Sequence, residues 1–332
     1  MEIPNGVERV NQYAFINCIG LSSVTIPNSV TSIGQRAFQD CIGLTAVSIP
    51  NSMAEIGYAA FVGCNNLTSI IVESENKKFD SRDECNAIIE TETNTLILGC
   101  KNSFIPNSVV AIADDAFRDC SGLLSMTIPN SVSVIGNYAF YNCSSMTSLS
   151  IGNSVSSIGE NAFGDCSSLT SVSIPNSVTT IGRYAFYGCN GLDNITIPYS
   201  VNSIGEYAFG ELTSIESHLL NPNIEVTYND WFNNAASNPF FVSENTTLYV
   251  PKGTIEAYRA TWPWNEFTNI EEFESAKGDV DYSGVVDIDD MNMVINTMLH
   301  KIETMATSDV NNDGVVDVDD MNIVINVILR KE

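Results

Sequence analysis

Residues 169–186 read Leu-Thr-Ser-Val-Ser-Ile-Pro-Asn-Ser-Val-Thr-Thr-Ile-Gly-Arg-Tyr-Ala-Phe, and close copies of this stretch recur along most of the chain. The step between copies is 23 residues except for one longer interval. The clearest copies begin at Ile26, Ile49, Ile105, Ile128, Ile151, Ile174 and Ile197, with a partial copy at Ile3. Self-similarity at a fixed period indicates stacked supersecondary units. The sequence therefore predicts a repeat solenoid over residues 1–216.

Each copy carries the same apolar positions, which we expect to line the core. In one copy they are Leu169, Val172, Ile174, Val178, Ile181, Ala185, Phe186 and Cys189. The Leu-x-x-Val-x-Ile segment predicts a short parallel strand, a second extended piece follows a corner, and Ala-Phe-x-x-Cys predicts a short helical turn. One coil buries about eight side chains at about 1.5–3 kcal/mol each, against about 1–2 kcal/mol for each ordered residue. A coil therefore needs stacked neighbours and caps.

Seven of the nine cysteines recur at one core position of the repeat. They are Cys18, Cys41, Cys64, Cys120, Cys143, Cys166 and Cys189. A small buried thiol behaves as a hydrophobe, and a straight row without histidine cannot surround a tetrahedral zinc ion. We expect these thiols to pack in the core.

The longer interval, within residues 72–104, predicts a hairpin insertion made of two apolar segments joined by a polar turn. A symmetric register would pair Glu90 with Thr95. The same register would place Cys85 opposite Cys100. Two alternatives stay open for this pair: two unrelated buried thiols, or a cross-strand disulfide favoured by an oxidising compartment.

The run at 169–186 resembles the BspA-like class of bacterial leucine-rich repeats, and the resemblance covers about the first 215 residues. It departs from ordinary leucine-rich repeats because Asn28 and its equivalents fall one residue early after Ile26. The resemblance implies a curved, cell-surface or secreted binding scaffold, which in some members is an adhesin for host matrix proteins. The hairpin also resembles an insertion common in this family.

The repeat pattern decays over residues 217–273, which we interpret as a C-terminal cap. Residues 247–250 predict a strand, and residues 255–260 predict a short helix with Thr254 as its N-cap. Residues 269–273 predict a closing strand. The aromatic residues Trp262, Trp264 and Phe267 have two interpretations, a sugar-stacking cluster or a cover over the last coil, and the second is favoured.

One short motif occurs twice near the C-terminus, with its copies 30 residues apart. Oxygen donors stand at loop positions 1, 3, 5, 9 and 12, a backbone carbonyl at position 7 and glycine at position 6, which is the spacing of a calcium loop. The ligand positions of the first copy are Asp279, Asp281, Ser283, Val285, Asp287 and Asp290. Those of the second are Asp309, Asn311, Asp313, Val315, Asp317 and Asp320. The sequence predicts two bound Ca²⁺ ions.

An amphipathic helix is expected after each loop, but no comparable helix is expected before either loop. This distinguishes the arrangement from an EF-hand pair, in which a helix stands on both sides of each loop. It resembles a type I dockerin module over about Gly278–Leu329, so a small all-α domain is expected at 274–332. The resemblance implies docking onto a cohesin-like partner through loop positions 10 and 11 and the following helix, in either of two orientations. Those positions are Ile288, Asp289, Val318 and Asp319, which depart from the Ser/Thr pair of the best-known cellulosomal class.

From Glu271 onward the chain has fifteen acidic and four basic residues. So short and acidic a domain should be poorly folded without metal, because its metal-binding free energy is then folding free energy.

The whole chain has a formal net charge of −26, which disfavours contact with nucleic acid and anionic membrane surfaces. It has neither an apolar run of about 20 residues for membrane insertion nor a signal peptide. Because Met1 falls inside a repeat, we expect an export signal and upstream repeats to be missing. The expected location is extracellular or at the cell surface.

Catalysis finds little support, because His218 and His300 lie beside no nucleophile–base–acid set and are expected at the surface. A stripe of tyrosines flanking the Ala-Phe turns is a candidate partner surface, the alternative being ordinary surface variation. Its members are Tyr138, Tyr141, Tyr184, Tyr187 and Tyr207.

Two classes of function follow from these features. The preferred one is a non-enzymatic, adhesin-like binding protein whose solenoid holds a host matrix protein or glycan while the dockerin-like module tethers it. The other is an accessory or hydrolytic component of a polysaccharide-degrading complex.

Overall fold

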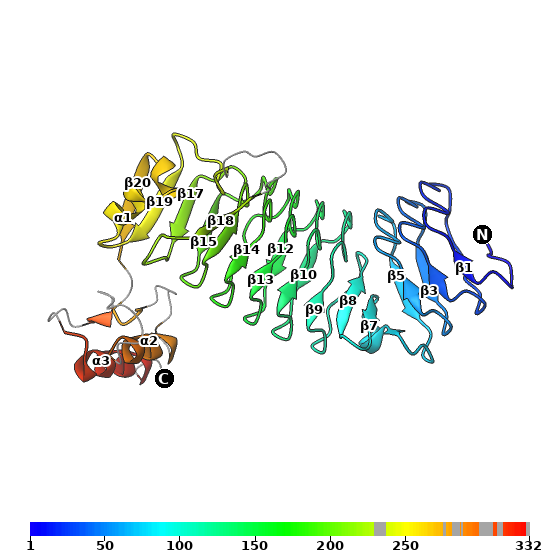
Figure 1. Ribbon diagram of the computed structural model, residues 1–332, viewed down its shortest axis with the longest axis horizontal. Coiled ribbons are helices and arrows are strands. Elements are labelled where there is room, and N and C mark those ends of the chain that lie inside the picture. Colours follow the sequence, from blue (N-terminus) through cyan, green and yellow to red (C-terminus); the bar gives the residue numbers. More distant parts are fainter. Residues whose placement is uncertain are drawn as a thin grey trace. The chain divides into compact units, whose positions relative to one another are not determined.

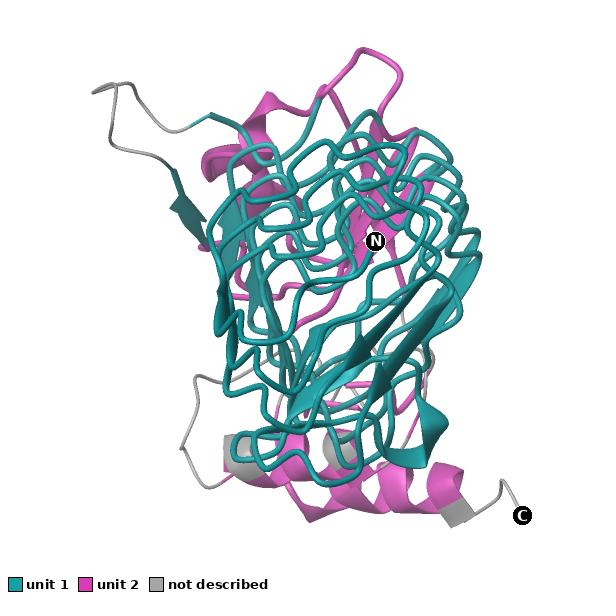
Figure 2. Ribbon diagram, turned by 90° about the vertical axis from the view of Figure 1, so that its right-hand side faces the viewer, with its two compact units in different colours: residues 1–193, 203–211, 225–241 teal, residues 194–202, 212–224, 242–332 magenta. Residues whose placement is uncertain are grey.

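The computed structural model divides into two compact units, shown in different colours in Figure 2. The described residues are 1–228, 237–274, 277–280, 286, 288–298, 308–310 and 315–329. Unit 1 comprises residues 1–193, 203–211 and 225–241, and unit 2 comprises residues 194–202, 212–224 and 242–332.

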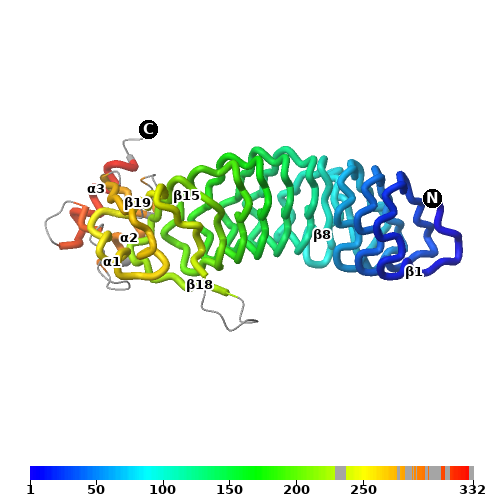
Figure 3. Tube along the Cα trace, turned by 90° about the horizontal axis from the view of Figure 1, so that it is seen from above, coloured from blue at the N-terminus to red at the C-terminus, as the bar shows by residue number. Residues whose placement is uncertain are grey.

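Unit 1 is a stack of coils, seen side by side in Figure 1 and along the Cα trace in Figure 3. Its largest sheet has the strand order β18-β16-β14-β13-β11-β9-β8-β7-β6. The parallel strands of this sheet are β8 (Thr95–Leu98), β9 (Ala111–Ile112), β11 (Val134–Ile135), β13 (Ser157–Ile158), β14 (Thr180–Ile181), β16 (Ser203–Gly205) and β18 (Glu225–Thr227). Successive coils meet in register, so that Ile158 pairs with Ile135 on one side and Ile181 on the other. The second extended piece of the repeat, not the Leu-x-x-Val-x-Ile segment, therefore builds the longest sheet.

Smaller parallel sheets complete the coils of unit 1. The order β1-β2-β4 joins Arg9–Val10, Ser32–Ile33 and Glu55–Ile56. The Leu-x-x-Val-x-Ile segments form the pairs β3–β5 (Ala46–Ile49, Ser69–Val72) and β10–β12 (Ser125–Thr127, Ser148–Ser150). These pairs confirm the parallel strand expected in that segment.

The Ala-Phe segments stack as tight turns, and they are not helices in the described chain. Within one coil, backbone bonds such as Cys143 N–H to the Phe140 carbonyl, 3.2 Å, span three residues. Tyr138 and Asn142 adopt φ of 55° and 56°, which stops the helical bonding from continuing. The remaining N–H groups donate to the next coil instead, as Phe140 does to the Ala162 carbonyl at 2.7 Å.

Behind these turns the repeated phenylalanine and cysteine positions form the core. The rings of Phe140 and Phe163 stack with centroids 5.2 Å apart. The Cys166 thiol donates to the Phe140 carbonyl at 3.2 Å, and burial raises the pKa of this thiol to about 12. Five of the seven ladder thiols are buried, whereas Cys18 and Cys120 are partly exposed. The predicted packing role fits this arrangement.

The insertion adds antiparallel strands to the edge of the largest sheet. Its elements are β6 (Phe79–Asp80), the 3₁₀ helix η1 (Arg82–Glu84) and β7 (Ile88–Glu90), which pairs with β8. Glu90 pairs with Thr95 as predicted, but an irregularity between Ile88 and Ile89 shifts the register before the cysteines are reached. The expected pairing of Cys85 with Cys100 is therefore wrong.

Both of these cysteines are free, buried thiols in the structure. Each lies near a backbone carbonyl: the Cys85 sulfur is 3.9 Å from the Ala87 oxygen, and the Cys100 sulfur is 3.6 Å from the Asn86 oxygen. Of the two alternatives, the structure has the unbridged one.

Unit 2 contains a four-stranded parallel sheet and a pair of helices. The sheet has the order β15-β17-β19-β20, with β15 (Asn194–Ile197), β17 (Ser214–Ser217), β19 (Thr247–Pro251) and β20 (Asn269–Phe273). Beside it lie α1 (Ile255–Ala260) and the 3₁₀ helix η3 (Trp264–Glu266), and the later helices are α2 (Ile288–Met298) and α3 (Val318–Leu329). The strands and helix expected at 247–250, 255–260 and 269–273 are present. No helix among the described residues is long and apolar enough to cross a bilayer.

Two details near α1 correct or sharpen the sequence interpretation. Thr254 makes no side-chain cap to the helix; its hydroxyl donates to the Pro251 carbonyl at 2.7 Å. Trp264 is fully buried and donates from Nε1 to the Pro222 carbonyl at 2.9 Å, as a covering residue would. Trp262 is 38% exposed, so the three aromatic residues do not act as one cluster.

Candidate functional site

The two predicted calcium loops lead into α2 and α3, which pack on a small apolar core. The fully buried residues of that core are Val294 and Val324, and Val280, Val286 and Val310 are nearly so. Since each valine of the first loop and helix has a counterpart in the second, the two copies share one core. The six ligand positions Asp281, Ser283, Val285, Asp287, Asn311 and Asp313 lie outside the described residues.

Three of the described ligand positions are buried carboxylates. Asp279 is 4% exposed, and Asp290 and Asp320 are fully buried. These side chains belong to loop positions 1 and 12, the ends of a calcium loop. Burying ionised carboxylates is costly unless a cation or several donors face them, so this donor set fits a hard divalent ion.

The backbone around the twelfth position folds the loops toward these oxygens. The Val280 N–H donates to Asp290 Oδ1 in the first loop. In the second loop the Asp317 N–H donates to Asp320 Oδ2 at 2.9 Å, and Asp317 Oδ1 accepts from the Asp319 N–H at 2.8 Å. Among the described residues no set of three acidic, histidine or cysteine side chains is gathered as a metal site. The described residues thus include the first and the last ligand position of each loop.

The predicted docking positions lie at the start of the two helices. Ile288 is 55% exposed and Val318 is 51% exposed, each at the first residue of its helix. Asp319 is exposed, and Asp289 lies in α2, where only its backbone is described. Each of the two helix starts therefore presents one exposed apolar residue.

The stripe of tyrosines separates into two clusters in unit 1. In the first, Tyr138 and Tyr141 meet edge to face at 5.7 Å, and the Arg118 guanidinium lies over both rings at 4.9 and 5.2 Å. Hydrogen bonding to Asp165, then burial, raises the Tyr141 pKa to about 12. Burial, then the negative charge of Glu160, raises the pKa of Tyr138. Both hydroxyls are neutral at physiological pH.

The second cluster gathers around Tyr184. Tyr184 stacks on Tyr207 at 5.4 Å and meets Tyr187 edge to face at 5.6 Å. Phe241 lies 5.8 Å from Tyr187 and 5.6 Å from Tyr207. Gly164 belongs to the coil between the clusters, and no ring contact joins them in the described chain.

Sequence reasoning missed Arg118 and Phe241 as members of these clusters. Arg118 has a local signal, since it stands in the coil just before the first pair of tyrosines. Phe241 has none, because it lies outside the regular repeat and reaches Tyr187 only through the fold.

His218 corrects one expectation. It is 7% exposed, not at the surface, and its Nε2 is hydrogen-bonded to Glu216 Oε1 beside the Phe273 ring. That bond lowers the Glu216 pKa. The hydroxyl of the adjacent Ser217 is hydrogen-bonded to the Tyr258 hydroxyl at 2.6 Å. His300 lies outside the described residues.

Comparison with known families gives two matches. The family model for the BspA type leucine rich repeat region matches residues 1–91, 95–216 and 133–250. The model for the dockerin type I domain matches residues 277–329. No curated protein matches the chain.

Solved structures give similar folds. A leucine rich cell surface protein from Faecalibacterium prausnitzii A2-165 is 34% identical, with a TM-score of 0.57, covering 71% of this chain and 62% of that one. This chain thus spans less than two thirds of that protein. The pneumococcal vaccine antigen PcpA is 20% identical over 83% of this chain and 67% of its own, with a TM-score of 0.67, which shows the shared fold.

Proposed function

The chain belongs to the BspA type leucine-rich repeat family and carries a type I dockerin domain, and from this premise we propose that it is an extracellular tethered binding protein. The repeats hold a protein or glycan ligand, and the dockerin module attaches the protein to a cohesin-like partner. Both matched modules are of a binding or scaffolding kind, so the proposed role is non-enzymatic. The pairing of the two modules in one chain carries this proposal.

Calcium is the cofactor of the proposed attachment, with one ion in each loop. The first ion would be held by the loop from Asp279 to Asp290 and the second by the loop from Asp309 to Asp320. Calcium, when bound, would neutralise the negative charge of the loop carboxylates. Asp290 and Asp320, which would hold it, lie in the first turns of the helices that begin at Ile288 and Val318. The buried carboxylates at positions 1 and 12 support this assignment.

Isothermal titration of the calcium-stripped full chain measures the number of ions. We expect about two ions per chain, and about one for Asp290→Asn or Asp320→Asn, because a neutral amide at position 12 weakens the loop. Glu274→Gln, an exposed acid outside both loops, serves as the charge-matched control and should keep both ions. Binding of no calcium by the unaltered chain would refute the assignment.

Attachment is tested by capturing cohesin domains on the immobilised full chain with calcium or with a chelator. We expect capture only with calcium. Because the two helix starts are similar, Ile288→Asp or Val318→Asp alone should weaken capture little, and the double variant should abolish it. Capture that persists in the double variant would place the interface elsewhere.

The tyrosine clusters are the proposed ligand surface of the repeats. Tyrosine and arginine are enriched at the centres of interfaces, and Tyr187 is 40% exposed. Tyr138→Ser with Tyr141→Ser and Tyr184→Ser with Tyr187→Ser should each reduce binding to matrix-protein or glycan arrays. The matched control Tyr249→Ser lies on the unit 2 sheet and should leave such binding unchanged.

A further inference from the structure

The insertion removes one turn from the stack of coils in unit 1. Leu96 accepts from the Ala113 N–H at 2.9 Å, and Gly99 donates to the Ala116 carbonyl at 2.8 Å. Residues 96–99 therefore occupy the place of a coil in front of residues 113–117. Only Ile97 and Leu98 separate Leu96 from Gly99, at the place where a complete coil makes its Gly-x-x-Ala-Phe turn. That coil has no turn.

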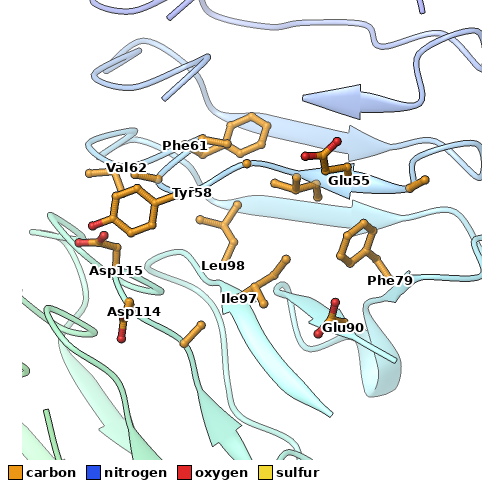
Figure 4. Close-up of a pocket in the computed structure, with 16 residues that line it drawn as sticks. Glu55, Tyr58, Phe61, Val62, Phe79, Glu90, Ile97, Leu98, Asp114 and Asp115 are labelled. Carbon is orange, nitrogen blue, oxygen red and sulfur yellow. The ribbon is translucent and has the colours of Figure 1, made fainter. Parts of the chain in front are cut away.

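A cavity of about 410 Å³ lies where the turn is missing. One wall is the turn of the preceding coil, residues 57–62, and the opposite wall is residues 113–115. Phe79, Ile97 and Leu98 from the insertion provide an apolar lining, as Figure 4 shows. All of these residues belong to unit 1.

A substitution in the repeat marks the same place in the sequence. The residue after the repeated Ile is glycine at Gly34, Gly57, Gly136, Gly159, Gly182 and Gly205. A Cβ added at Gly136 would lie 2.6 Å from the Ala113 carbonyl carbon, so the backbone of the preceding coil excludes a side chain there. Position 113 holds alanine because no turn precedes it.

The missing turn also leaves main-chain groups facing the cavity. In complete coils the phenylalanine N–H donates to the next coil, as Phe38 does to the Ala60 carbonyl at 2.8 Å. The residue two before the phenylalanine donates in the same way, as Arg36 does to the Tyr58 carbonyl at 3.0 Å. In the turn beside the cavity these two residues are Ala59 and Phe61, and no hydrogen bond from either N–H is found in the described chain. An extended peptide supplies carbonyl acceptors for such donors.

The polar lining of the cavity is acidic. Glu55, Glu90, Asp114 and Asp115 line it, and no lysine or arginine does. Asp115 is 4% exposed, and its Oδ1 accepts from Arg118 Nη1 at 2.9 Å. The carboxylate lies beside the Tyr58 hydroxyl in Figure 4, and burial, then hydrogen bonding to Asp115, raises the pKa of Tyr58 to about 12. A cationic group from a ligand would complement this wall.

We propose that the cavity binds an extended peptide segment of a partner protein that carries a lysine or arginine next to an apolar side chain. The peptide main chain takes the place of the missing turn at Ala59 and Phe61. The apolar side chain contacts Phe79 and Leu98, and the cation faces Glu55 and Glu90. This proposal rests on the proposed role of the repeats as a binding scaffold and adds a second site, separate from the tyrosine clusters, with its own ligand chemistry.

The N–H groups of Ala59 and Phe61 lie at positions that donate hydrogen bonds between coils elsewhere in the stack. Such donors favour a peptide ligand over a sugar. Of the three aromatic residues that line this cavity, Phe61 and Phe79 are buried at 3% and 4% exposure, and Tyr58 is exposed at 48%. Tyr58 offers one ring to a saccharide, whereas the main-chain donors and the acidic wall match the carbonyl groups and the cation of a peptide. A ligand with acidic side chains would meet four carboxylates and be repelled.

A phage library of random octapeptides, selected on the immobilised full chain, tests the proposal. We expect the enriched peptides to carry lysine or arginine beside an apolar residue. Their affinity should fall at least tenfold for Ala113→Leu, which fills the cavity, and for Glu55→Gln with Glu90→Gln, which removes two charges without changing shape. Melting temperatures of the variants establish that they are folded.

The matched controls are Ala111→Leu, two residues earlier and outside the cavity, and Glu75→Gln with Glu211→Gln, exposed acids elsewhere in unit 1. Neither should change peptide binding. Absence of enrichment, enriched peptides that bind the cavity variants normally, or displacement of the peptides by oligosaccharides would each overturn the proposal. Calcium-dependent cohesin capture by Ala113→Leu is measured in parallel, so that failure of the cavity is distinguished from failure of the tethering role.

Discussion

At the scale of single residues, the repeated glycine allows the backbones of neighbouring coils to approach each other closely. A Cβ added at Gly159 would lie 2.6 Å from the carbonyl carbon of Gly136. No backbone shift at one position relieves that contact without stretching the strand hydrogen bonds on both sides. The repeated Ile-Gly pair thus reflects coil spacing more than turn flexibility.

Gly159→Ala should destabilise unit 1 by about 1–3 kcal/mol, the usual cost of overpacking. Ala113→Gly is the matched reverse change at the one position where a turn is missing, and it should cost about 1 kcal/mol or less. Urea unfolding of the full chain, followed by circular dichroism, compares the two midpoints. Equal midpoints would show that the coils are not packed as closely as described.

The ladder thiols make a second prediction at this scale. Burial raises the pKa of Cys41 to about 11 and that of Cys166 to about 12. At pH 8 both thiols are therefore protonated, and only the thiolate is reactive. Both side chains are also fully buried, so a reagent in solution does not reach them. Iodoacetamide should label Cys166 in urea but not in the native protein over the same time, as read by mass spectrometry. Rapid native labelling would contradict the buried ladder.

At the scale of elements, the turns show how tertiary hydrogen bonds replace helical ones. Local sequence favours a helical turn at Ala-Phe-x-x-Cys, yet residues such as Tyr138 with positive φ direct N–H groups toward the next coil. The bonds gained between coils repeat along the stack, whereas a single helical turn is intrinsically unstable. The element adopts the conformation that its neighbours can share.

Strand β17 and the residue after it carry a pH-dependent contact. The hydrogen bond from His218 lowers the pKa of Glu216 in the folded state. A lowered carboxyl pKa stabilises the fold above the unfolded-state value, and that stability is lost as pH falls through the folded value. Glu216→Gln should therefore lower the melting temperature at pH 6 but not at pH 3.

The expected effect at pH 6 is about 0.5 kcal/mol or less, because Glu216 is half-exposed and solvent screens the pair. Glu225→Gln, an exposed acid of β18, is the control and should show no such difference. A variant equally destabilised at both pH values would point to lost packing, not lost charge.

At the scale of the whole molecule, the two kinds of module should respond differently to metal. The repeats are held by strand ladders and stacked rings, and their described residues gather no group of acidic, histidine or cysteine side chains that could hold a metal ion. The described core of the acidic segment 274–332 is small, with five buried valines and partly buried methionine, valine and isoleucine residues packed against them. We therefore expect its fold to depend on calcium in a way that the fold of the repeats does not.

Adding a chelator to the full chain should reduce helix content and remove a low-temperature unfolding step, while the step from the repeats stays within about 2 °C. The physical reason is that metal binding stabilises only the folded loops, by an amount set by the free calcium concentration. Calorimetry with and without calcium measures both steps. A repeat step that shifts with calcium would mean that the ion binds elsewhere.

Much of the fold could be predicted from the sequence, because the information is periodic. A 23-residue step fixes which isoleucines pair, and pairs such as Ile158 with Ile181 follow from it directly. The calcium loops and the strands at 247–250 and 269–273 are local patterns as well. In each case the residues that decide the structure lie close together in the chain or repeat at one interval.

The sequence by itself determined the solenoid, the register of its regular coils and the dockerin type I domain after them. Only the tertiary structure decided that His218 is buried, that Cys85 and Cys100 are out of register, and that the insertion leaves a cavity without a turn. These features depend on where the chain re-enters the stack after an irregular segment. That position is set by packing between distant residues, and no period in the sequence records it.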